Sequence, residues 1–151
     1  MATSAFASTM TYRFHTNIFT RPPHALEGEA FNFHNLQLST LRAAPFNATF
    51  SLTFEQAFEA LAKLPRLDAE PDGFFVIAGE SQGQRWQVDG HLYDFNDRLH
   101  RVDLHGECPP DAFDAILVCL GWPATPLAFE LVMEGVALDE ATFRRWAAQA
   151  T

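Results

Sequence analysis

The stretch that decides the fold is residues 73–120, GFFVIAGESQGQRWQVDGHLYDFNDRLHRVDLHGECPPDAFDAILVCL. It predicts an antiparallel meander followed directly by a buried helix. The apolar run Phe74–Ala78 opens the meander, and further strand candidates lie at Arg85–Val88, His91–Phe95 and Leu99–Leu104. Short alternating segments separated by turn residues are typical of strands joined by hairpins.

Two dipeptides are expected to form turns in this meander. Asp89-Gly90 separates two strand candidates, which is a strong hairpin signal. With Asn96-Asp97 as a second two-residue turn, one face becomes largely apolar, whereas a three-residue turn would slip the last strand and mix the two faces. The expected apolar face carries Trp86, Val88, His91, Tyr93, Phe95, His100, Val102 and Leu104. The expected charged face carries Arg85, Gln87, Leu92, Asp94, Leu99, Arg101, Asp103 and His105.

The residues after the meander predict a helix over 110–120. Pro109 and Pro110 fit a helix N-terminus, where the missing N–H costs nothing. Gly121 and Pro123 are typical of a helix end. Because the helix is apolar nearly all round, we expect it to lie on the apolar face of the meander with other helices behind it.

The first third of the chain is rich in Phe, Thr and Asn and predicts short strands. Tyr12–Ile18, Ala30–His34 and Phe46–Phe50 alternate apolar and polar residues, as half-buried strands do. The alternation changes parity near Asn35, which indicates a bulge or a new element there.

Three further helices are expected. Thr53 and Gln56 form a capping box that begins a helix over 53–64. The region 126–134 has capping signals but also alternates like a strand, and we interpret it as a helix. Asp139 is expected to cap a last helix, so 126–150 would hold two C-terminal helices, a structural pair rather than a DNA-binding helix-turn-helix.

Length and composition limit which folds and which partners are possible. At 151 residues the chain is expected to form a single α+β domain with a mainly antiparallel sheet and helices packed on one face. The net charge of −9 argues against nucleic acid and anionic membranes. Residues 1–50 carry +1 and the remainder −10, which suggests either a basic partner or simply a soluble surface.

Few features of the sequence indicate where in the cell the protein lies. Cys108 and Cys119 form no disulfide framework, so a cytoplasmic, reducing compartment is expected. No 18-residue apolar run is present. Residues 1–25 lack acids and resemble a transit peptide, although the strand-like Tyr12–Ile18 argues against that interpretation.

The polar stretch Asp89–Cys108 holds the candidate site residues. In the expected register His91 and His100 point inward, whereas Asp94, Asp103 and His105 point outward. No three ligands then converge on one face, and we expect neither metal nor cofactor. The catalytic candidates are His91, Tyr93 and His100, which are expected to neighbour one another on the inner face of the meander. The alternative is that these three are core residues. Cys108, near His105, is a further candidate as a nucleophile, though a plain residue next to a helix cap is more common.

The sequence contains no phosphate-binding loop, nucleophile elbow or zinc-binding motif. In size and charge the chain resembles bacterial immunity proteins and secretion chaperones, a likeness carried by no motif. The expected function is therefore a non-enzymatic cytosolic module that binds a protein partner. The alternative is a small-ligand binder or hydrolase that uses the His/Tyr cluster.

Overall fold

The computed structural model describes residues 10–23, 25–42, 46 and 48–149 of the chain. These residues form strands and helices in the proportions of an α+β protein, which confirms the expected class. In chain order the elements are β1 (Tyr12–Thr20), β2 (Leu26–Glu27), β3 (Phe31–Phe33), β4 (Leu36–Leu38), β5 (Leu41–Arg42), α2 (Phe54–Ala62), β6 (Leu67–Ala69), β7 (Phe74–Ser81), β8 (Gln84–Phe95), β9 (Arg98–Cys108), α3 (Pro110–Val118), β10 (Leu127–Leu131), β11 (Val136–Asp139) and α4 (Glu140–Gln149).

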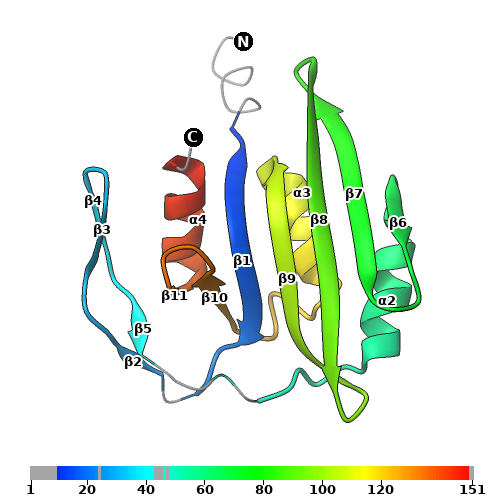
Figure 1. Cartoon of the computed structure of the whole chain (residues 1–151), viewed down its shortest axis with the longest axis horizontal. Coiled ribbons are helices and arrows are strands. Elements are labelled where there is room, and N and C mark those ends of the chain that lie inside the picture. The colour runs from blue at the N-terminus through cyan, green and yellow to red at the C-terminus, as the bar shows by residue number, and fades with distance from the viewer. Residues whose placement is uncertain (1–9, 24, 43–45, 47, 150–151) are drawn as a thin grey trace.

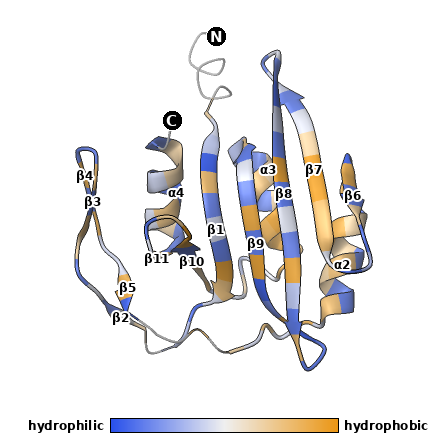
Figure 2. Ribbon diagram, viewed as in Figure 1, coloured by the Kyte–Doolittle hydropathy of each residue, from blue (hydrophilic) through white to orange (hydrophobic). Residues whose placement is uncertain are grey.

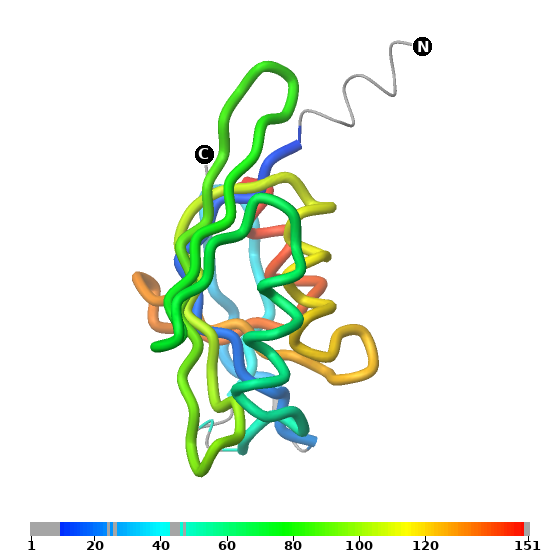
Figure 3. The backbone as a smooth tube through the Cα atoms, turned by 90° about the vertical axis from the view of Figure 1, so that its right-hand side faces the viewer, coloured from blue at the N-terminus to red at the C-terminus, as the bar shows by residue number. Residues whose placement is uncertain are grey.

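One large antiparallel sheet organises the molecule. Its strand order is β2-β5-β11-β10-β1-β9-β8-β7-β6, while β3 and β4 form a separate hairpin (Figure 1). Seen edge-on, α2, α3 and α4 all lie on one side of the sheet (Figure 3). We call that side the helix-covered face. The other side carries no helix of the described residues, and we call it the open face.

The predicted turn at Asp89-Gly90 is wrong, because β8 runs without interruption from Gln84 to Phe95. The hairpin turn lies instead at Gln82-Gly83, where both φ angles are positive at 55° and 75°. Gly90 serves packing instead: a Cβ there would lie 2.1 Å from the Phe75 ring. Glycine is needed inside this strand because an aromatic ring rests on its backbone.

The predicted two-residue turn at Asn96-Asp97 is confirmed, with φ values of 52° and 66°. Beyond it, however, Tyr93 pairs with Arg101 instead of His100, so His100 is the extra residue of a β-bulge. The bulge lets Leu99 and Val102, three residues apart, both reach the core, where each is fully buried. An unbroken strand would have sent one of them to the opposite face.

The bulge and the misplaced turn overturn the predicted faces. Leu92 and Leu99, expected on the charged face, are buried in the core. His91, Tyr93 and Phe95, expected on the apolar face, alternate with the buried Leu92 and lie on the open face. Figure 2 shows the resulting pattern, in which polar and apolar residues alternate along β1, β8 and β9.

Local signals predicted most helices correctly. The capping box of α2 is present, with Gln56 N donating to Thr53 Oγ1 at 3.1 Å and Thr53 N donating to Gln56 Oε1 at 2.9 Å. Asp139 caps α4 by accepting a hydrogen bond from Thr142 N at 2.8 Å. α3 begins at Pro110 as expected, but Val118 is 56% exposed, so the prediction that this helix is covered on its outer side is wrong.

The predicted helix over 126–134 is also wrong, because this region forms β10 and the turn into β11. β10 pairs with β1 on one side and with β11 on the other, so its backbone N–H and C=O groups are hydrogen-bonded within the sheet. This pairing outweighs the local capping signals.

In the first third of the chain, the strand at Tyr12–Ile18 is confirmed as β1, which lies in the middle of the sheet between β10 and β9. The segment Ala30–His34 contains β3, and β4 is the new element expected near Asn35. Residues 46 and 48–50 are not a strand, and residue 47 lies outside the described residues. Of the 25 residues that resemble a transit peptide, 1–9 and 24 are also outside them, and the others include β1. No helix among the described residues is long and apolar enough to cross a membrane.

Candidate functional site

Outward-pointing polar side chains form an ordered grid on the open face. In β1, β9 and β8 every second residue points away from the helices, and strand register aligns these residues into rows. The rows are Arg13, Glu107 and Gln87; then His15, His105 and Asp89; then Asn17, Asp103 and His91. Because one face of each strand packs on the core, the register that builds the grid is fixed by burial.

Direct contacts hold this grid together. Arg13 binds Glu107 through Nε at 3.1 Å and an Nη atom at 2.7 Å. His15 and His105 are opposite each other and stack with their ring centres 4.2 Å apart. His15 Nε2 lies 3.5 Å from Asp103 Oδ1, which orients the imidazole. The grid is therefore a pre-organised polar surface.

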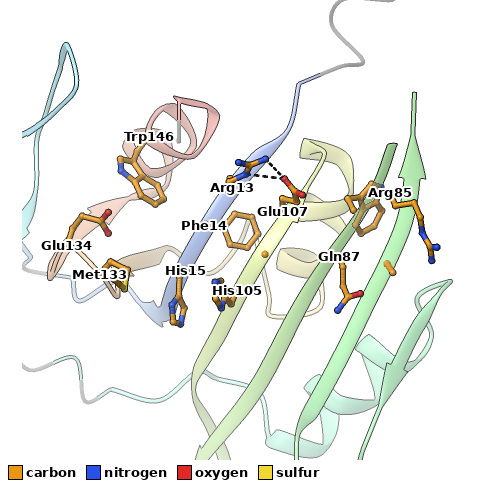
Figure 4. Close-up of a pocket in the computed structure, with 13 residues that line it drawn as sticks. Arg13, Phe14, His15, Arg85, Gln87, His105, Glu107, Met133, Glu134 and Trp146 are labelled. Carbon is orange, nitrogen blue, oxygen red and sulfur yellow. Dashed lines mark hydrogen bonds and ion pairs between the residues drawn. The ribbon is translucent and has the colours of Figure 1, made fainter. Parts of the chain in front are cut away.

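A groove of about 560 Å³ crosses the upper part of the open face (Figure 4). Its floor is made by β1, β9 and β8, with His15, His105 and Gln87 among the residues that line it. Met133 and Glu134, in the turn between β10 and β11, form the wall at one end of the groove. This turn projects on the side of the sheet opposite the helices (Figure 3). This volume is in the range of ligand-binding clefts.

Apolar side chains lie at the end of the groove near this turn. Met133 is 80% exposed, whereas Phe14 and Trp146, which also line the groove, are buried. β10 ends at Leu131 while β1 continues to Tyr12, so Trp146 of α4 is reached from the open face beside the unpaired end of β1. An exposed methionine at a groove rim offers an adaptable apolar contact.

The two ends of the groove carry opposite charges. Glu134 belongs to the β10–β11 turn and Arg85 to β8 (Figure 4). Both side chains are exposed, and within the described part of the chain neither has a hydrogen bond or ion pair. Between them, Arg13 and Glu107 neutralise each other. The groove is thus polarised from end to end.

The structure brings together two of the three predicted catalytic residues. His91 and Tyr93 stack with ring centres 4.5 Å apart, and Arg101 lies 3.8 Å over the other side of Tyr93. His100, moved by the bulge, packs on Phe19 instead at 5.8 Å. All three lie on the open face and none lines the groove, so their predicted position on the inner face is wrong.

Both cysteines lie in the core and neither lines the groove. Cys108 is fully buried on the helix-covered face, and burial raises the pKa of its thiol to about 12, with Asp111, Asp114 and Glu107 adding to the effect. Cys119 is 9% exposed, and burial raises its pKa as well. Both behave as small apolar residues, as expected for Cys119. Among the described residues no three or more His, Cys, Asp or Glu side chains converge on a common metal position.

The groove itself was missed by sequence reasoning. Its residues come from six separate parts of the chain, at positions 13–15, 78, 85–87, 105–107, 133–134 and 146. The local signal was the alternation of Arg13 and His15 with apolar neighbours. This pattern indicates a strand with one exposed face, but it does not show which other segments lie next to that face. No protein-family model matches the chain, and no curated protein or solved structure is significantly similar to it.

Proposed function

We propose that this protein is a non-enzymatic, cytosolic module that binds another protein, and that the open face of its sheet is the binding surface. The observation that carries the proposal is the groove on that face, with an exposed apolar rim and a floor of fixed polar groups. Interfaces combine these features, because apolar contact supplies affinity and placed polar groups supply specificity.

The chemistry of the lining supports binding over covalent catalysis. No serine, threonine, cysteine or lysine is among the described residues that line the groove. Both cysteine thiols are buried elsewhere, and their raised pKa values oppose formation of the thiolate. Free, buried cysteines are also compatible with a reducing compartment.

Charge on the open face favours a partner of mixed charge. The outward-facing acids of β10, β1, β9 and β8 are Glu130, Asp103, Glu107 and Asp89, and the outward-facing bases are Arg13, Arg85, Arg98 and Arg101. These balance, so the acidic excess of the chain lies elsewhere. A strongly basic partner, as overall composition suggests, would find little net attraction on this surface.

A photo-crosslinking experiment tests the proposal. A photoreactive amino acid is placed at Asp89 on the open face or, as a matched control, at Glu59 on α2; both positions are exposed acids. In lysate of the source cells, the Asp89 protein is expected to crosslink to a discrete protein that the Glu59 protein does not capture. Equal capture from both positions, or none from Asp89, would overturn the proposal.

A second candidate function is binding and acid–base chemistry on a small ligand. It is favoured by one contact, the 3.5 Å approach of His15 Nε2 to Asp103 Oδ1, because a carboxylate that orients an imidazole is a common arrangement for a general base. A metabolite library screened by thermal shift tests it. A hit whose effect disappears in His15→Gln but persists in His91→Gln would favour this candidate over the protein-binding module.

A further inference from the structure

The direction of the groove sets the shape of what it can hold. Its lining begins at the β10–β11 turn, crosses β1, β9 and β8, and reaches Ala78 on β7. Neighbouring strands are about 4.8 Å apart, so four strand spacings amount to roughly 19 Å. An extended chain advances about 3.3 Å per residue, so about six residues cover that length.

The floor of the groove suits a polypeptide backbone. His15, His105 and Gln87 line it, and each of these side chains can both donate and accept hydrogen bonds, the histidines in their neutral form. An extended backbone presents N–H and C=O groups in alternation, and it therefore needs donors and acceptors together. A phosphate would need donors only, and an acyl chain would need an apolar floor.

The ends of the groove select the charges of the chain that crosses it. Glu134 is a free carboxylate at one end and Arg85 a free guanidinium at the other, within the described part of the molecule. The Arg13–Glu107 pair between them has no net charge to offer. A complementary chain has a basic side chain at the Glu134 end and an acidic side chain at the Arg85 end. Beside Glu134, exposed Met133 adds an apolar contact.

We propose that the groove binds an extended peptide segment of about six residues, basic and apolar at the β10–β11 end and acidic at the β8 end. The inference rests on the proposed function and specifies its partner: the partner protein supplies this segment. The segment follows the groove across β1, β9 and β8, over the lining residues that Figure 4 draws.

Selection from a phage-displayed library of random decapeptides against the full-length protein tests the inference. Enriched peptides are expected to contain one basic and one acidic residue about four positions apart, with an apolar residue beside the base, because three strand spacings, roughly 14 Å, separate the β10–β11 turn from β8. Their affinities are then measured by fluorescence anisotropy for wild type, Glu134→Lys, Arg85→Glu and the control Glu59→Lys. The control makes the same charge change as Glu134→Lys, at an exposed site on the helix-covered side.

Reversing one charge at an exposed pair is expected to weaken binding roughly five- to tenfold in Glu134→Lys and Arg85→Glu, and to leave Glu59→Lys at wild-type affinity. A peptide in which the basic residue is replaced by Glu should regain affinity for Glu134→Lys only. No enrichment, or enriched peptides that bind all four proteins equally, would overturn the inference. If Asp89 still crosslinks to a partner in that case, the proposed function stands and only the peptide assignment fails. If peptides behave as expected but crosslinking shows no preference for Asp89, the groove binds peptides and the module's proposed partner is wrong.

Discussion

The two faces of the central sheet are made by alternate residues of the same strands, yet they differ in burial and in the kinds of side chain they carry. On the helix-covered face, Phe113, Phe129 and Phe143 pack ring against ring with centres 4.5–6.2 Å apart, and all three are fully buried. On the open face, His15 and His105 also stack, but in contact with water. Stability is therefore expected to come mainly from the helix-covered face. The residues of the open face are then free to serve binding.

The two faces also differ in how each one pairs an arginine with carboxylates. Arg144 lies on the helix-covered side, 19% exposed, and pairs with Asp114 at 2.8 Å and Glu140 at 3.0 Å. Burial disfavours its charge, but hydrogen bonds to Tyr12 and Asp114 outweigh that cost and raise the pKa of Arg144. Arg13, on the open face, is 55% exposed and pairs with Glu107 alone. One arginine ties β1, α3 and α4 together, whereas the other orders a surface.

The largest expected effect of a substitution is in the core. Leu117 of α3 is fully buried, so Leu117→Ala should lower the free energy of unfolding by about 2–5 kcal/mol, through lost burial and the cavity left behind. Chemical denaturation followed by tryptophan fluorescence measures the loss. A change below about 1 kcal/mol would mean that α3 is peripheral and that the face it covers is not the stabilising one.

A pH dependence should also arise on the helix-covered face. The Cys108 thiol has a pKa of about 12 in the folded chain against 9.0 when unperturbed, so between those values the unfolded state binds fewer protons and stability falls as pH rises. The loss has an upper limit of roughly 1.4 kcal/mol per pH unit. Unfolding free energies from pH 8 to 10.5 should fall more steeply for wild type than for Cys108→Ala. Parallel curves would contradict this expectation; Cys119 is present in both proteins, so its own contribution cancels.

Substitution of two glycines in turn distinguishes the stability cost of a steric clash from the cost of an unfavourable backbone conformation. Gly90→Ala places a methyl group 2.1 Å from the buried Phe75 ring and should cost about 1–3 kcal/mol, because the core must shift. Gly83→Ala meets no atom within 4 Å, and only its φ of 75° opposes it, at about 1 kcal/mol. Thermal unfolding of both variants checks the order. A larger loss at Gly83 would show that the hairpin turn, not the contact under Phe75, limits β8.

The smallest expected difference tests the two arginines. Arg144→Met removes a partner from two carboxylates and should cost about 1–3 kcal/mol. Arg13→Met breaks one exposed pair and should cost less than about 1 kcal/mol. Urea unfolding at low and high salt measures both. Equal losses would show that the open face contributes to stability as much as the other face does.

Prediction from sequence succeeded where the signal was local. The capping box at Thr53, the cap at Asp139 and the turn at Asn96-Asp97 each depend on neighbours within a few residues, and each is confirmed. It failed where two local signals competed. Asp89-Gly90 and Gln82-Gly83 are both turn-forming dipeptides, and the structure uses the second because Phe75 needs the space above Gly90. Leu99 and Val102, both apolar and three residues apart, were the available sign of the bulge.

The sequence by itself determined that this chain is an acidic α+β protein with a meander, capped helices and ample aromatic core, because composition and short-range capping and turn chemistry act along the chain. Only the tertiary structure decided which residues face water and which meet in the groove. Strand register and the bulge at His100 set those faces, and both depend on burial of residues such as Leu99 and Val102 against helices far away in the sequence. A one-residue change in register inverts a face, so no local pattern could place Arg13, Arg85 and Glu134 around one groove.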